Sequence, residues 1–214
     1  MIRLHGGPTP NARKIAIALL EMGLEWELVD VDILAGDQLT PEFLALNPNN
    51  KTPVIEDMNG PHGRRFVLWE TGAILLYLAE KTGRFLPADP EARALCWQWL
   101  MFQLSGVGPM FGQFAHFVFY AKDKHPYAIE RYTRERERLL GVLDGQLAKT
   151  AWVSGDEYTI ADMAMLPYLA GSMKGEPGRY PHLQRWGAAM FERPAVAAGM
   201  KVGTARKETI ERRL

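Results

Sequence analysis

The sequence contains only one cysteine, Cys96, in 214 residues. A single thiol excludes an intrachain disulfide, a Cys-x-x-Cys redox pair and a metal site made of several cysteines. Cys96 stands near the start of a predicted helix, and we expect it to be a small buried apolar side chain. Any thiol chemistry therefore has to use thiols supplied from outside the chain.

The sequence also lacks an excess of charge, because 25 Lys and Arg residues balance 25 Asp and Glu residues. Neither sign forms a long block, so the surface offers no general attraction to DNA or to an anionic membrane. His116 and His125 have no partners at metal-ligand spacing, and we interpret both as structural. We therefore expect no nucleic-acid partner, no membrane partner and no metal.

Long hydrophobic runs are absent as well. No run of about 18 apolar residues occurs, and Gly6, Gly7 and Pro8 interrupt the N-terminal segment before it reaches secretory length. These features lead us to expect a cytosolic protein. The hydrophobic content of 47% is sufficient to bury an ordinary core, either in one large domain or in two small ones.

Short strands and short helices alternate over residues 1–81. Thr9-Pro10-Asn11 forms the turn into the first helix, and Gly23 closes that helix. Thr40 followed by Pro41 is typical of a helix cap with proline at the first helical position. The expected order is βαβαββα, with strands at 2–5, 25–31, 53–57 and 65–69 and helices at 11–22, 41–46 and 71–81.

The strand signals stop after residue 90. Residues 82–90 contain glycine and two prolines, with Asp89 in front of Pro90, which indicates a linker that ends in a helix cap. Residues 91–214 then read as an all-α domain with helices at 91–119, 128–147, 161–170 and 183–191. Within it, Thr159 and Asp162 have the spacing of a capping box, which we interpret as structural.

Thr52-Pro53 opens the third strand. Proline supplies no N–H there, and a cis bond before it would turn neighbouring backbone groups outward, where Thr52 could pair with a peptide ligand. The alternative is an ordinary edge-strand proline in a turn, and spacing alone favours that alternative because most X-Pro bonds are trans.

Seventeen residues after Pro53, the segment Glu70-Thr71-Gly72 begins a helix. A hydroxyl together with the N–H groups of a helix N-terminus can bind a carboxylate, and Glu70 could hold an ammonium group. The alternative is a plain helix cap. Lys51 and Gln38 lie on loops, where they either meet a second carboxylate of the ligand or are solvated surface residues.

These residues belong to two longer motifs, PNNKTPVI at residues 48–55 and ETGAILLYL at residues 70–78. In order and spacing they match the signatures of the glutathione transferase superfamily, which the sequence resembles over essentially all of its length. Thr71 stands where the family commonly has serine, a change that keeps the hydroxyl. The segments PTPN at 8–11, GPMFGQ at 108–113 and PYAIERY at 126–132 make the sequence most similar to the bacterial nu-class branch.

The resemblance implies a thioredoxin-like N-terminal domain followed by a helical C-terminal domain. It implies an enzyme that binds two reduced glutathiones or one glutathione disulfide, reduces disulfide bonds, and conjugates electrophiles weakly. Peroxide reduction is a known side activity of such enzymes. Because the cleft of the family lies at a subunit contact, the resemblance also implies a homodimer.

The resemblance further implies which residues hold glutathione. Gln38 and Lys51 would contact the glycyl end, Thr52 the cysteinyl backbone, and Glu70 and Thr71 the γ-glutamyl end. Asn50 and Pro53 complete the turn that presents Thr52.

The residues implied near the sulfur are unusual. Well-known branches of the family place a tyrosine, serine or cysteine there, whereas this sequence offers Thr9 and Asn11, with Arg131 approaching from the helical domain. Only about 3% of a free thiol is ionised at pH 7, and lowering its pKa by two units requires about 2.7 kcal/mol. Hydrogen bonds to an anion contribute about 1.5–3 kcal/mol each, so donors from Thr9 and Asn11 and the start of the first helix suffice without a general base.

Two alternatives stay open. Arg131, Arg134 and Arg138 share one helix face and are by default a solvated basic surface, and only Arg131 gains a role from the motif. A chain without the usual tyrosine, serine or cysteine could also be a non-catalytic binding or regulatory module that kept the fold.

Overall fold

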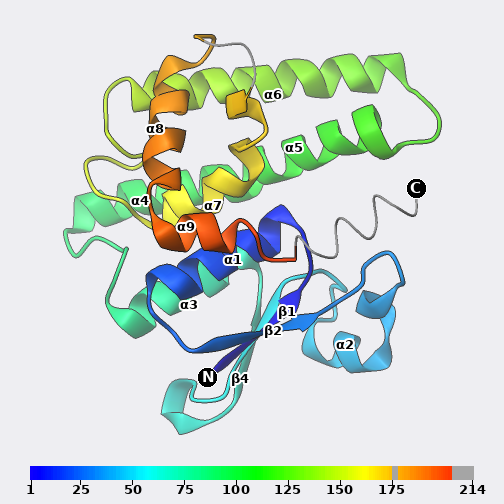
Figure 1. Ribbon diagram of the computed structural model, residues 1–214, viewed down its shortest axis with the longest axis vertical. Coiled ribbons are helices and arrows are strands. Elements are labelled where there is room, and N and C mark those ends of the chain that lie inside the picture. The colour runs from blue at the N-terminus through cyan, green and yellow to red at the C-terminus, as the bar shows by residue number, and fades with distance from the viewer. Residues whose placement is uncertain (175–177, 204–214) are drawn as a thin grey trace. The chain divides into compact units, whose positions relative to one another are not determined.

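The structure is a computed structural model that describes residues 1–174 and 178–203 (Figure 1). The chain divides into two compact units. Of the described residues, the first unit contains Met1–Arg84 together with residues 192–203, and the second is Phe85–Phe191. The expected helical part, 91–214, includes residues 192–203, which here belong to the first unit.

The first unit contains a four-stranded mixed sheet with the strand order β2-β1-β3-β4. β1 pairs with β2 in parallel, and the other two pairings are antiparallel. The strands lie at the positions that the sequence predicts: β1 (Ile2–Gly6), β2 (Trp26–Asp30), β3 (Val54–Asp57) and β4 (Phe66–Trp69).

Helices cover both faces of this sheet. α1 (Pro10–Glu21) packs on β1 and on α3 (Thr71–Thr82), while α2 (Pro41–Leu46) follows the short 3-10 helix Asp37–Leu39. Phe43 of α2 is buried against Val54, whose side chain points away from that of its neighbour Ile55 because strand residues alternate between faces. The βαβαββα order predicted from the sequence is confirmed, and the fold of this unit is thioredoxin-like.

One helix of the first unit is absent from the sequence prediction. α9 (Pro194–Gly199) packs along α1, and Figure 1 shows the two side by side. The contact is close, since a Cβ added at Gly199 would lie 2.6 Å from Cγ1 of Ile17. Arg193 donates two hydrogen bonds to the carboxylate of Glu21, at 2.6 and 2.9 Å, so the last described helix is fastened to the first one.

The second unit is helical, as predicted. The predicted helix 91–119 is observed as two α-helices that alternate with two π-helical segments. The elements are α4 (Pro90–Phe102), a π segment (Gln103–Val107), α5 (Gly108–Ala115), a second π segment (His116–Tyr120), α6 (Pro126–Leu147), α7 (Ile160–Leu169), a 3-10 turn (Ser172–Lys174) and α8 (Pro181–Phe191).

The predicted capping box at the start of α7 is confirmed. Asp162 is completely buried and its carboxylate accepts hydrogen bonds from the backbone N–H groups of Val153 and Thr159 and from Nε1 of Trp186. Burial raises the pKa of Asp162 to about 6, although each of these hydrogen bonds acts in the opposite direction. Cys96 is also buried as expected, and burial raises the pKa of its thiol.

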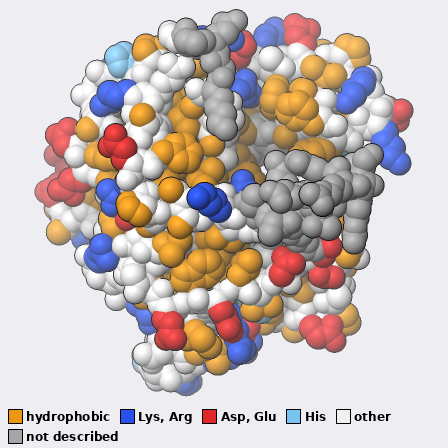
Figure 2. Space-filling model, viewed as in Figure 1, with side chains coloured by type: hydrophobic (Ala, Val, Ile, Leu, Met, Phe, Trp, Pro, Cys, Tyr) orange, Lys and Arg blue, Asp and Glu red, His pale blue; other side chains and the backbone are white. Residues whose placement is uncertain are grey.

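The surface agrees with the balanced composition. Figure 2 shows Lys and Arg side chains interspersed with Asp and Glu side chains, with apolar atoms between them. Among the helices of the described part of the chain, none is long and apolar enough to cross a membrane.

Candidate functional site

A small polar pocket of about 150 Å³ lies in the first unit, where three segments converge. These are the first turn of α1, the loop that leads from α2 into β3, and the start of α3. Six of the ten residues predicted for the site line it, together with two further asparagines: Asn11, Asn47, Asn49, Lys51, Thr52, Pro53, Glu70 and Thr71. The structure therefore brings together residues that are up to 60 positions apart in the sequence.

The loop before β3 is held in shape by Asn47, which the sequence analysis did not select. Asn47 is only 1% exposed, and its Nδ2 donates to the carbonyl of Lys51 at 2.7 Å. Its Oδ1 accepts from the N–H of Asn49 at 2.9 Å, a side-chain turn that asparagine commonly makes. Asn50, between Asn49 and Lys51, has a positive φ of 49°. Asn47 therefore positions the backbone on which Lys51 and Thr52 reach the pocket.

The bond between Thr52 and Pro53 is cis, which is the less common of the two arrangements considered from the sequence. Pro53 is buried and Thr52 is half-buried, and both line the pocket.

The start of α3 forms another wall of the pocket. Glu70 precedes the helix with φ 70° and ψ 112°, a conformation that costs a non-glycine residue about 1–3 kcal/mol and that is frequent at functional sites. Its side chain makes no capping hydrogen bond to the helix. The next residue, Thr71, is buried, and its Oγ1 accepts a hydrogen bond from Nζ of Lys14 at 3.2 Å.

The start of α1 brings Asn11 into the pocket but uses Thr9 differently. Thr9 is the N-cap of α1, and its Oγ1 accepts from the N–H of Ala12 at 3.2 Å. Pro10 follows at the first helical position. Since a hydroxyl both donates and accepts, this cap leaves the O–H of Thr9 able to act as a donor.

Two predicted loop residues lie outside the lining of the pocket. Gln38 belongs to the 3-10 helix before α2, where its Nε2 donates to the carbonyl of Ile33 at 3.2 Å. Its Oε1 is buried and has no hydrogen-bond partner among the described residues. Asn50 is at the tip of the loop before β3 and is also absent from the lining.

Arg131 lies in the second unit, on α6, and lines a separate pocket of about 410 Å³. Arg134 and Arg138 line the same pocket, which confirms that the three arginines share a face. Arg134 pairs with Glu130 at 3.6 Å and Arg138 with Glu135 at 2.8 Å. Two of the three arginines therefore belong to ion pairs on the exposed face of α6.

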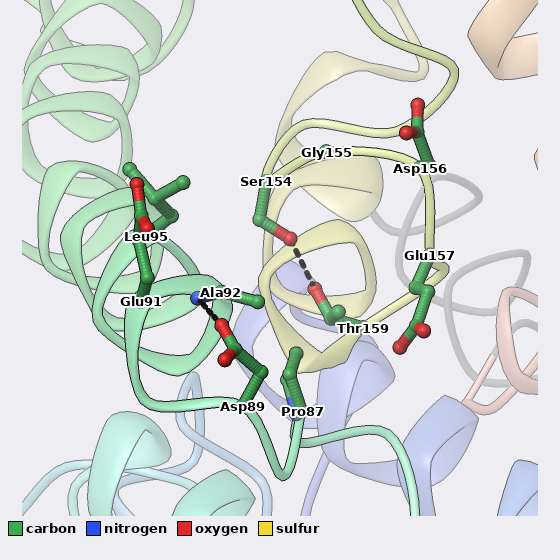
Figure 3. A pocket seen from close by; sticks show the side chains of 10 residues that line it. All are labelled: Pro87, Asp89, Glu91, Ala92, Leu95, Ser154, Gly155, Asp156, Glu157 and Thr159. Atoms are coloured by element: carbon green, nitrogen blue, oxygen red, sulfur yellow. Dashed lines mark hydrogen bonds between the residues drawn. The ribbon is translucent and has the colours of Figure 1, made fainter.

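A further pocket of about 340 Å³ lies in the second unit between the start of α4 and the turn before α7 (Figure 3). Four acidic residues line it, but its hydrogen-bonding groups serve the helix caps. Asp89 accepts from the N–H of Ala92 at 2.9 Å, and the hydroxyls of Ser154 and Thr159 bond to each other at 3.0 Å. No predicted site residue lines this pocket.

The pocket of the first unit suits a small zwitterionic peptide. The start of α3 and the hydroxyl of Thr71 are complementary to a carboxylate, and Glu70 is complementary to an ammonium group. Asparagine side chains supply further donors and acceptors. Among the described residues, no group of three His, Cys, Asp or Glu side chains is arranged to hold a metal ion.

Two family models match the chain. Residues 9–81 match the glutathione S-transferase N-terminal domain, and residues 108–194 match the glutathione S-transferase C-terminal domain. The chain is 43% identical over 203 residues to the disulfide-bond oxidoreductase YfcG of Escherichia coli K12, an alignment that covers 94% of each protein.

Solved structures agree with this relationship. A glutathione transferase family member from Pseudomonas fluorescens Pf-5, with two glutathiones bound, is 44% identical and superposes with a TM-score of 0.87 over 94% of this chain and 92% of its own. A glutathione transferase from Pseudomonas putida, with one glutathione disulfide bound per subunit, is 44% identical with a TM-score of 0.88 over 94% and 90% of the two chains. The chain therefore belongs to the glutathione S-transferase family.

Proposed function

We propose that this chain binds glutathione in the pocket of the first unit and uses its thiolate to reduce disulfide bonds, with glutathione conjugation and peroxide reduction as further activities. The observation that carries the proposal is the convergence of Asn11, Lys51, Thr52, Glu70 and Thr71 on one pocket. A relative that is 43% identical is named a disulfide-bond oxidoreductase, and the two Pseudomonas structures contain glutathione or its disulfide. These relatives support the same ligand and the same reaction here.

In the proposed complex, the γ-glutamyl carboxylate binds at Thr71 and the start of α3, while its ammonium group faces Glu70. The cysteinyl backbone pairs with Thr52. The glycyl carboxylate lies toward Lys51 and Gln38, whose Nζ and Nε2 carry the donors that a carboxylate accepts. The sulfur then lies at the first turn of α1.

The reaction consists of two exchanges. The thiolate of the first glutathione attacks one sulfur of the substrate disulfide, forms a mixed disulfide and releases the other sulfur as a thiolate. A second glutathione thiolate attacks the glutathione sulfur of the mixed disulfide, which releases the second substrate thiol and leaves glutathione disulfide. Thr9 and Asn11 stabilise the attacking thiolate by hydrogen bonds, and Arg131 supplies positive charge.

The proposal extends to assembly and location. We propose a homodimer, supported by Trp97 and Met101, large apolar side chains four residues apart on α4 that are 43% and 46% exposed in the single chain. A soluble cytosolic enzyme is consistent with the balanced surface charge. Sedimentation of the purified protein tests the dimer.

The test of the proposed chemistry is glutathione-dependent reduction of a small model disulfide, measured beside conjugation of a standard electrophile. The double variant Thr9→Ala/Asn11→Ala should raise the pKa of the bound glutathione thiol, followed by thiolate absorbance, and slow disulfide reduction. An unchanged rate contradicts the proposed mechanism. Glutathione binding without activity in either assay would identify a non-catalytic module instead.

Thr9 also caps α1, so the experiment needs a matched control for the lost cap. Thr40→Ala provides it, because Thr40 caps α2 with the same Thr-Pro arrangement and accepts from the N–H of Phe43 at 3.3 Å. Both substitutions should cost about 1 kcal/mol of stability. Only the loss of Thr9 should change the thiol pKa.

A further inference from the structure

Lys14 is a fully buried lysine, only 1% exposed, on the face of α1 that packs against α3. Lysine is almost never fully buried unless its charge is compensated, because removing an ammonium group from water costs several kcal/mol. Burial lowers the pKa of Lys14 to about 7, and the negative charge of Glu70 acts in the opposite direction. The sequence analysis gave this residue no role.

The hydrogen bond from Lys14 to Thr71 has a defined direction. Nζ donates and Oγ1 of Thr71 accepts, at 3.2 Å, since both the charged and the neutral form of a lysine carry N–H donors. A threonine hydroxyl that accepts one hydrogen bond still has its own proton to donate. Because Thr71 lines the pocket, that proton is available to an acceptor placed there.

We infer that Lys14 is a positioning residue for the γ-glutamyl carboxylate of glutathione: it fixes the hydroxyl of Thr71 as a donor to that carboxylate. The inference rests on the proposed function, since it concerns the same pocket. Lys14 itself is not among the residues that line the pocket, so it acts through Thr71.

A purely structural role of Lys14 predicts different effects of Lys14→Met on protein stability and on glutathione affinity. Burial disfavours the charged form of Lys14 by more than Glu70 favours it, which is why its pKa is lowered, so removing the charge should not by itself destabilise the fold. If Lys14 serves the ligand, Lys14→Met should leave the unfolding free energy equal or higher while it weakens glutathione binding. If Lys14 serves only the fold, stability should fall and the affinity of the folded protein should not change.

The experiment compares Lys14→Met, Thr71→Val and the double variant in glutathione titrations and in disulfide reduction. We expect Lys14→Met to raise Kd and KM for glutathione about tenfold with kcat changed less than twofold. In the double variant the two losses should not add, because both substitutions remove the same oriented hydroxyl. Arg13→Met is the matched control, since it removes the neighbouring cation of α1 and should leave KM unchanged.

A second ligand and a second variant sharpen the test. Cysteinylglycine lacks the γ-glutamyl group, so its affinity should be the same in wild type and Lys14→Met. Lys14→Gln keeps a hydrogen-bond donor for Thr71 and should lose no more than about threefold in affinity.

Three outcomes overturn the inference: unchanged glutathione affinity in folded Lys14→Met, additive losses in the double variant, or a loss in Lys14→Gln as large as in Lys14→Met. In each of these the wild type still binds glutathione. A wild-type protein that binds none would instead contradict the proposed function itself, so the two failures are distinguishable.

Discussion

Asp162 is the residue of the second unit whose loss should destabilise the protein most clearly. Its carboxylate accepts hydrogen bonds from the N–H of Val153 at 3.0 Å, the N–H of Thr159 at 3.0 Å and Nε1 of Trp186 at 2.9 Å. All of these groups are buried. Asp162→Ala leaves these three buried N–H donors without their acceptor.

The expected magnitude follows from that count. Each buried donor left unsatisfied costs about 1–3 kcal/mol, so three of them give about 3–9 kcal/mol before relaxation or entry of water. A typical domain has about 5–15 kcal/mol of stability in total. We therefore expect a loss of about 5 kcal/mol for Asp162→Ala. Asp162→Asn keeps one oxygen for Val153 and Trp186 and should lose about half as much.

Urea unfolding, followed by tryptophan fluorescence and far-UV circular dichroism, measures this loss. Because the chain has two compact units, unfolding can occur in two transitions, and the shift should appear in the transition of the second unit. Asp156→Ala is the control, since Asp156 is an exposed acid in the loop before the same helix. If Asp162→Ala shifts the transition no more than Asp156→Ala, the reasoning from buried donors is refuted.

Three further predictions concern α1. The pKa of Lys14 is lowered from 10.5 to about 7, so between pH 7 and pH 10.5 the unfolded chain binds a proton that the folded chain lacks. The unfolding free energy should therefore rise with pH in this range, by up to about 1.4 kcal/mol per pH unit. Lys14→Met should show no such rise. Gly199→Ala should lower the melting temperature by overpacking against Ile17, at a cost of about 1–3 kcal/mol, and an unchanged melting temperature would show that α9 is not tightly docked. A double-mutant cycle on Glu21 and Arg193 should give a coupling of about 1 kcal/mol in urea unfolding, and a coupling of zero would mean that their two hydrogen bonds add no stability.

Most elements could be predicted because their boundaries carry local signals. Pro10, Pro41 and Pro90 stand at first helical positions, and Gly23 and Gly83 follow helix ends in positive-φ conformations. These signals act within a few residues, so a single sequence reveals them.

The helix that was missed, α9, has six residues and is too short to be stable by itself. Its stability comes from the packing of Gly199 against Ile17 and from the hydrogen bonds of Arg193 to Glu21. Each of these pairs is more than 170 positions apart in the sequence. Packing between such distant residues leaves no periodic pattern that a sequence reading can detect.

In the candidate site, too, features with a local sequence signal could be predicted and features that depend on packing between distant residues could not. The motifs around Lys51 and Glu70 predicted which residues meet in the pocket, while the roles of those residues stay predictions. Asn47 had a local signal that was overlooked, because an asparagine just before Pro48 commonly makes side-chain turns. Lys14 had none, since a lysine in a helix normally lies at the surface and only the packing of α1 on α3 buries it.

The return of α9 to the first unit has a consequence for synthesis on the ribosome. Domains generally fold as they emerge, N-terminal segments first. Here the sheet and α1 to α3 emerge early, yet the partner that covers Ile17 and neutralises Glu21 is made only after the entire helical unit. The thioredoxin-like unit therefore begins to fold first and is completed last, and a nascent chain stalled before Pro194 should expose this strip of α1 to chaperones.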